Sequence, residues 1–139
     1  MRWLIWRRLD AYRDLGLLVL RVGLGAMMIG HGWPKLAGGV ETWEKLGGAM
    51  AHLGITTAPA AWGLAASLSE CVGGALLVLG LATRPAALSL AITMFVAFWM
   101  HFDGGDGFRG WSHAAEDGIA FLALVILGGG RYSLDERLR

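Results

Sequence analysis

The sequence predicts an all-α integral membrane protein, a bundle of four transmembrane helices. Apolar types make up 55% of the 139 residues and charged types only 17%, which is less charge than a small soluble domain carries. Four long apolar runs follow one another over residues 15–32, 59–81, 86–102 and 114–130. About 20 residues of α-helix cross the hydrocarbon core of a bilayer, so each run can span it. We expect all 139 residues to form one domain.

Lipid supplies no hydrogen-bond partner to the backbone, so these four runs are expected to be helices. The alternation of apolar and polar residues that is typical of transmembrane β-strands is absent. A soluble bundle of unusually apolar helices is the alternative. Soluble helices keep a polar face, however, and these four runs do not, which favours the membrane.

The long first outer loop, residues 33–58, contains a fifth helical pattern. Its apolar residues recur at helical spacing, and its polar residues occupy the opposite face. The apolar face carries Val40, Trp43, Leu46, Met50 and Leu53, and the polar face carries Glu41, Glu44, Lys45 and His52. This pattern predicts a short amphipathic helix that lies on the outer surface or folds over the mouth of the bundle.

The distribution of basic residues predicts the orientation. With the N-terminus inside, the outer loops hold only Lys35, Lys45 and Arg109. The cytoplasmic segments then hold Arg2, Arg7, Arg8, Arg13, Arg84, Arg131, Arg137 and Arg139. The positive-inside rule therefore places both termini in the cytoplasm. Residues 1–14 are expected to form an amphipathic lead-in with Trp3 and Trp6 at the level of the lipid headgroups.

Charge and cysteine content limit the possible functions. A formal net charge of +1 without a basic patch argues against nucleic acid as a partner. The single cysteine, Cys71, allows no internal disulfide and no CxxC redox pair. If the protein moves electrons, a bound cofactor or a partner must carry them.

Two charged residues interrupt the apolar runs, Arg21 in the first and Glu70 in the second. A charge at the bilayer centre costs at least about 2.5–3.5 kcal/mol, so each is expected to face the bundle interior. Glu70 shares a stripe with Ala66 and Gly74, and small residues mark contact faces between membrane helices. We predict an Arg21–Glu70 ion pair. It would either fix the helix register or form a buried ionisable site for protons or a polar ligand; that the two residues do not meet is the third alternative.

A second group of polar residues gathers at the predicted outer ends of the helices. It comprises His31, Lys35, His101, His113, Glu116 and Asp117. Three imidazoles and a carboxylate could hold a metal, but no ligand-pair spacing repeats, and no metal is expected. A polar pocket for the head of a quinone is the favoured alternative, with these groups as proton partners. Histidines at helix ends are also commonly just solvated.

Six short motifs, taken in order, resemble those of the DoxX family of small bacterial membrane proteins. They lie at residues 20–23 (LRVG), 31–36 (HGWPKL), 70–74 (ECVGG), 80–87 (GLATRPAA), 116–117 (ED) and 128–135 (GGGRYSLD). Each motif alone is weak, and their order and spacing carry the resemblance, which covers nearly the whole chain from Leu15.

The resemblance implies a four-helix fold in the bacterial inner membrane. Family members are associated with thiosulfate:quinone oxidoreductase membrane subunits and with oxidoreductase complexes of oxidative-stress defence. The family's polar positions fall here on Arg21, His31, Lys35, Glu70 and Glu116. This chain departs from the larger thiosulfate-oxidising relatives because it has neither a soluble domain nor a cysteine pair, which argues against a self-sufficient oxidoreductase.

Three functions follow as hypotheses. The first is a membrane subunit of a quinone-linked oxidoreductase system, with electrons supplied by a partner protein or a small reductant. The second is a non-enzymatic scaffold for a redox or stress-defence complex, in which the charges only set packing. The third, a small-solute carrier, is disfavoured because four short helices hold no inverted repeat. Besides the lipid bilayer, a partner protein or a homo-oligomer is expected, and glycine-rich helices favour self-association.

Overall fold

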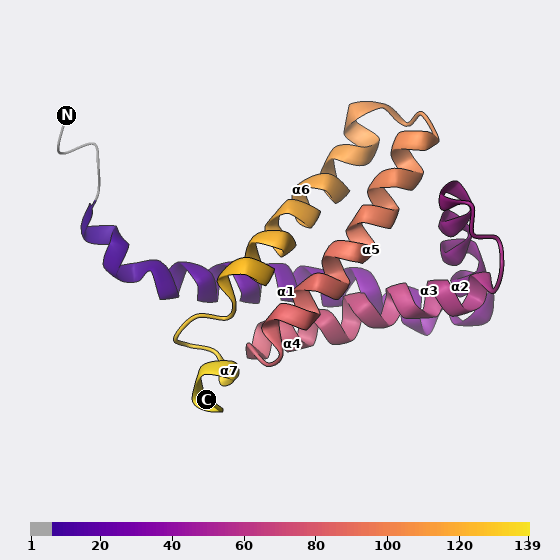
Figure 1. Ribbon diagram of the computed structural model, residues 1–139. Helices are drawn as coiled ribbons and strands as arrows, with labels where there is room; N and C mark the ends of the chain where they lie inside the picture. The colour runs from indigo at the N-terminus through magenta and orange to yellow at the C-terminus, as the bar shows by residue number, and fades with distance from the viewer. Residues whose placement is uncertain (1–6) are drawn as a thin grey trace.

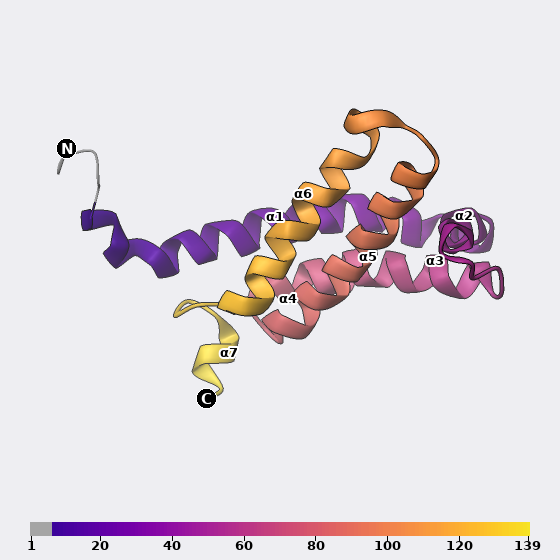
Figure 2. The ribbon, with the colours of Figure 1, turned by 45° about the horizontal axis from the view of Figure 1, so that its top comes forward.

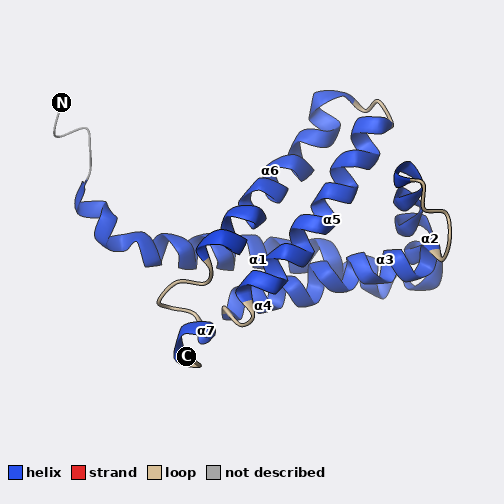
Figure 3. Ribbon diagram, viewed as in Figure 1, coloured by secondary structure: helices blue, strands red, loops and turns tan. Residues whose placement is uncertain are grey.

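A computed structural model describes residues 7–139, and this part of the chain is all-α (Figure 3). Trp3 and Trp6, predicted to lie at headgroup level, are outside the described residues. The elements are η1 (Arg7–Tyr12), α1 (Arg13–Ala37), α2 (Gly39–Gly47), η2 (Gly48–Leu53), α3 (Pro59–Leu68), η3 (Ser69–Gly73), α4 (Gly74–Leu79), α5 (Thr83–Asp103), α6 (Gly107–Leu127) and α7 (Leu134–Arg137). Elements η1 and η2 are 3-10 helices, and η3 is one turn of π-helix that joins α3 to α4.

Four helical segments are long and apolar enough to cross a membrane: Leu9–Ala37, Pro59–Leu79, Thr83–Asp103 and Gly107–Leu127. They correspond to the four predicted runs and confirm the all-α membrane fold. The predicted end of the first run, at residue 32, is wrong, because α1 continues through Pro34 to Ala37. Proline is tolerated in a transmembrane helix when its neighbours satisfy the freed backbone groups.

Helix α1 runs antiparallel to the continuous segment α3–η3–α4, as both ribbon views show (Figures 1 and 2). Glycines bring the two backbones together. A Cβ on Gly25 would approach the carbonyl oxygen of Gly74 to 2.5 Å, and a Cβ on Gly32 would approach Cys71 N to 2.8 Å. Close approach at small residues is typical of helix contacts in membranes.

The predicted amphipathic helix is present as α2, and it packs along the first half of α3. Gly47 lies against Pro59, and Gly63 lies against the backbone of Trp43, so tightly that no Cβ fits at either glycine. Helix α2 thus continues the path of α1 beside the same partner. The next element, η2, reaches α5, where Trp99 Nε1 donates to the carbonyl oxygen of His52 (3.1 Å). This segment was expected to lie on the outer surface or to fold over the mouth of the bundle. The second position fits η2 better than α2.

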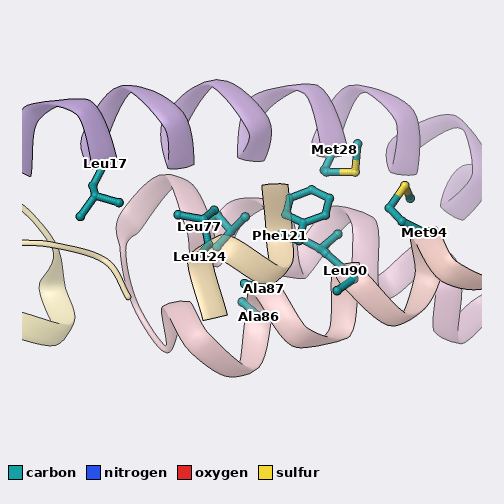
Figure 4. Close-up of a cluster of buried hydrophobic side chains, with 10 residues drawn as sticks. Leu17, Met28, Leu77, Ala86, Ala87, Leu90, Met94, Phe121 and Leu124 are labelled. Carbon is teal, nitrogen blue, oxygen red and sulfur yellow. The ribbon is translucent and has the colours of Figure 1, made fainter. Parts of the chain in front are cut away.

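Helices α5 and α6 form a hairpin that crosses the α1–α4 layer at an angle (Figure 1). The core lies where the two layers meet, and Figure 4 shows Phe121 and Leu124 of α6 among side chains from α1, α4 and α5. The buried apolar residues are Leu17, Met28, Leu77, Ala86, Ala87, Leu90, Ala91, Met94, Phe121 and Leu124. The opposite faces remain apolar and exposed, for example Ile119 and Ile126, as lipid contact requires.

After α6 the chain folds back against the starts of α1 and α5. Asp135 accepts hydrogen bonds from the backbone N–H groups of Ala82 (2.6 Å) and Thr83 (2.8 Å), which are otherwise unpaired at the start of α5. Burial alone would raise the pKa of Asp135, but these hydrogen bonds and the charge of Arg139 outweigh it and lower the pKa below its usual value. The tail is therefore an integral part of the bundle.

Candidate functional site

The buried carboxylate of Glu70 pairs with Lys35. Lys35 Nζ lies 2.7 Å from both carboxylate oxygens. The side chain of Glu70 is 3% exposed and that of Lys35 is 34% exposed. One partner is thus sealed inside the bundle, and the other reaches its edge.

The pair lies deep in the membrane, because Glu70 is near the middle of the 21-residue span Pro59–Leu79. At about 1.5 Å per residue, its backbone is roughly 15 Å from either end of that span. Lys35 reaches this depth because α1 passes Pro34, and because α2, rather than α1, packs beside the first half of α3. Lys35 was predicted to lie in the outer loop, because the first helix was expected to end at residue 32.

The predicted Arg21–Glu70 ion pair is wrong. Arg21 is 1% exposed, and its guanidinium donates only to backbone carbonyls: those of Leu77 (2.9 Å), Val78 (2.7 Å), Gly129 (3.2 Å) and Tyr132 (2.6 Å). Antiparallel packing explains the error, since Arg21 lies beside residues 77 and 78, about two helical turns from Glu70. Arg21 does face the interior as predicted, but it fastens the tail to the bundle.

A second ionisable group lies on the α6 side of α1. The rings of His31 and His113 lie edge to face with their centroids 6.4 Å apart. His113 Nδ1 is 3.2 Å from Asp117 Oδ2; the Asp117 side chain is 18% exposed and the His113 side chain 72%. His31 is exposed as well. Gly32, next to His31, packs on Glu70 and Cys71, so His31 lies at the depth of the buried pair rather than at the end of a span.

These two groups share a face of α1, because His31 and Lys35 are one helical turn apart. Glu70, Lys35, His31, His113 and Asp117 therefore follow one another from η3 across α1 to α6. We call these five residues the ionisable row. Charged and ionisable side chains inside apolar spans commonly mark proton or ligand paths, because their burial is costly.

Two of the predicted site residues lie elsewhere. His101 was expected to point into the bundle, but its Nδ1 contacts Asp106 Oδ2 at 2.5 Å in the connection to α6, where both are partly exposed. Glu116 is exposed on α6, although the resemblance assigned it a family position. On one face of α6 His113 is followed after four residues by Asp117, which leaves Glu116 to one side.

A chain of hydroxyl groups beside Glu70 was missed by the sequence analysis. The Ser69 and Ser89 hydroxyls are 2.6 Å apart, and Thr93 Oγ1 donates to Ser69 Oγ at 3.0 Å. The sequence could have indicated this chain, because these three residues interrupt apolar spans and hydroxyl groups commonly join membrane helices. They connect η3 to α5 and so hold the turn that carries Glu70.

The ionisable row contains both hydrogen-bond donors and proton acceptors. Among residues 7–139, no group of three or more His, Cys, Asp or Glu side chains is placed to hold a metal ion. The row instead combines an ammonium group and imidazoles, which donate hydrogen bonds, with carboxylates, which accept protons. Carbonyl or hydroxyl oxygens of a small ring are chemically suited to such partners.

Comparison with known proteins identifies the family. The sequence model of the DoxX family matches residues 16–103, more than half of the chain. The matched segment includes α2, η3 and Lys35, Glu70 and His31 of the ionisable row. No curated protein and no solved structure shows a significant match. The match over this range shows that the chain belongs to the DoxX family.

Proposed function

We propose that the protein is a membrane subunit of a quinone-linked oxidoreductase system and that the ionisable row binds the quinone head. The observation that carries the proposal is the Lys35–Glu70 pair, a carboxylate 3% exposed at mid-membrane depth beside a lysine that is 34% exposed. The exposed part of Lys35 leaves the pair accessible to a ligand at the edge of the bundle. Membership of the DoxX family also supports a redox role.

The residues of the row suit proton-coupled chemistry. A bound quinone supplies reversible two-electron, two-proton redox chemistry. Lys35 and His31 would donate hydrogen bonds to the two ring oxygens, and Glu70 and Asp117 would hold protons next to these donors. The contact of Asp117 Oδ2 with His113 Nδ1 would orient the imidazole. Electrons would come from a partner protein or small reductant, because Cys71 is the only cysteine.

We further propose the bacterial inner membrane with both termini in the cytoplasm. The N-terminal part of α1, the start of α5 and the tail lie together, joined by Asp14, Asp135 and Arg21. Five arginines belong to these segments, Arg13, Arg84, Arg131, Arg137 and Arg139, and Arg7 and Arg8 of η1 directly precede α1. The positive-inside rule assigns such an end to the cytoplasm.

A scaffold for a redox or stress-defence complex is the second candidate, and Arg21 favours it. This buried charge has only backbone partners and no ligand-facing role. If Lys35 and Glu70 were equally structural, the row would fix helix positions and bind nothing. The two candidates differ in what a gently extracted protein carries.

Native mass spectrometry after extraction in a mild detergent tests the proposal. We expect the wild-type protein to retain a quinone, and Lys35→Met/Glu70→Met to lose it while remaining folded, because the double change removes both charges together. Glu44→Gln, an exposed carboxylate on α2, is the matched control and should retain the quinone. A wild-type protein that neither carries a quinone nor binds added ubiquinone would leave the scaffold as the better account.

A further inference from the structure

A cavity of about 660 Å³ lies at the end of the bundle that holds the tail, away from the ionisable row. Its walls come from Asp14 of α1, the start of α5, the end of α6 with the residues that follow it (127–131), and the tail around α7. Since α5 begins and α6 ends at this cavity, it lies at the level where the apolar spans meet the lipid headgroups. Its volume is in the range of small-molecule sites.

One wall of the cavity holds a buried hydroxyl group. Thr83 is fully buried, and its Oγ1 has no hydrogen-bond partner among residues 7–139. It lies beside Gly129, where a Cβ would come within 2.7 Å of the hydroxyl oxygen. Gly129 and Ser133 pack around this hydroxyl, and the Asp135 carboxylate lies next to it, so these residues close one wall of the cavity.

Two of the arginines that line the cavity have guanidinium groups without a partner among residues 7–139. Asp14 accepts a hydrogen bond from the Arg131 backbone N–H (3.1 Å), and Asp135 accepts those of Ala82 and Thr83. Glu136 lies 3.4 Å from Arg139. The guanidinium groups of Arg84 and Arg131, in contrast, make no hydrogen bond or ion pair within residues 7–139, and both residues line the cavity and are exposed. The three carboxylates thus have hydrogen-bond or ion-pair partners, whereas these two guanidinium groups have none within residues 7–139.

We infer that this cavity binds a phosphate group, that of an anionic phospholipid headgroup. Guanidinium groups form bidentate hydrogen bonds with phosphate oxygens. Basic pockets between transmembrane helices at the cytoplasmic surface are suited to anionic headgroups. Free inorganic phosphate has the same chemistry, but the position of the cavity at the ends of the spans favours the lipid.

The test uses the full chain purified in a mild detergent and titrated with short-chain phosphatidylglycerol, phosphatidylcholine or inorganic phosphate, with native mass spectrometry as the readout. We expect phosphatidylglycerol to bind and phosphatidylcholine to bind at least tenfold more weakly. Arg84→Gln/Arg131→Gln should weaken phosphatidylglycerol binding about a hundredfold, about tenfold for each lost charge-assisted hydrogen bond. Arg137→Gln, on α7 outside the cavity, is the matched control and should bind within about twofold of wild type.

Competition in the wild-type protein gives a measurement that needs no variant. Millimolar phosphate, but not equal ionic strength of sodium chloride, should displace part of the lipid if a phosphate group is recognised. Inorganic phosphate that binds as tightly as phosphatidylglycerol would support the site but assign it to free phosphate. Unchanged lipid binding in Arg84→Gln/Arg131→Gln, or an equal loss in Arg137→Gln, would overturn the inference, because general surface charge would then explain the binding.

Discussion

Arg21→Met is expected to cause the largest loss of stability among single changes in this protein. The substitution leaves four carbonyl groups, of Leu77, Val78, Gly129 and Tyr132, without their buried donor. Hydrogen bonds to charged groups contribute about 1.5–3 kcal/mol each, and breaking a buried charged contact typically costs about 3–5 kcal/mol. We therefore expect little folded protein, or a free energy of unfolding in mixed micelles that is lower by at least about 3 kcal/mol.

Two companion variants separate this effect from general charge loss. Arg21→Lys keeps the charge but has a shorter reach and fewer donors, so we expect an intermediate stability. Arg13→Met removes an exposed arginine of the same helix and should change stability by less than about 0.5 kcal/mol. An Arg21→Met protein as stable as wild type would mean that the tail is not fastened through this residue.

Gly63→Ala is expected to destabilise the protein strongly through the contact between α2 and α3. A Cβ at this position would overlap the carbonyl group of Trp43, so α2 would have to move away from α3. Overpacking of a close contact usually costs about 1–3 kcal/mol, and here the opposing atoms belong to a backbone that has no rotamer to change. We expect the melting temperature to fall by several degrees and the Trp43 Nε1 bond to the Lys35 carbonyl to be lost.

Gly23→Ala provides the matched control. A Cβ on Gly23 meets no atom within 4 Å, and alanine is the better helix former by up to about 1 kcal/mol. The variant should be as stable as wild type or slightly more so. Equal destabilisation by Gly63→Ala and Gly23→Ala in the same thermal assay would contradict the tight α2–α3 contact.

The fold was largely predictable, because four apolar runs in a chain with little charge leave few alternatives in a membrane. The interior position of Glu70 followed from its small neighbours, and that of Arg21 from its cost in lipid. The partners of these two residues, however, could not be predicted from the sequence. They depend on where along each other the antiparallel helices pack, and the contacts at Gly25 and Gly32 that set this register are not visible in apolar periodicity.

The residues of the ionisable row were named from the sequence, but their arrangement could not be predicted from it. His31, Lys35, His113 and Asp117 were recognised, yet they were assigned to the outer ends of the helices. The continuation of α1 through Pro34, and the packing of α2 against α3, bring His31 and Lys35 to the depth of Glu70. A proline after an apolar run usually indicates the end of a helix, so local sequence rules led to the wrong depth.

The pairing of Lys35 with Glu70 inside the bundle is tested most directly by a double-mutant cycle in the free energy of unfolding. Lys35→Met should destabilise the protein by about 3 kcal/mol or more, because it leaves the buried Glu70 carboxylate without its partner. Glu70→Met should cost less, because the lysine that it leaves unpaired is 34% exposed. The double variant should be much more stable than the sum of the two losses implies, with a coupling energy of at least about 1 kcal/mol. Additive losses would show that the two side chains do not interact and would contradict the ionisable row.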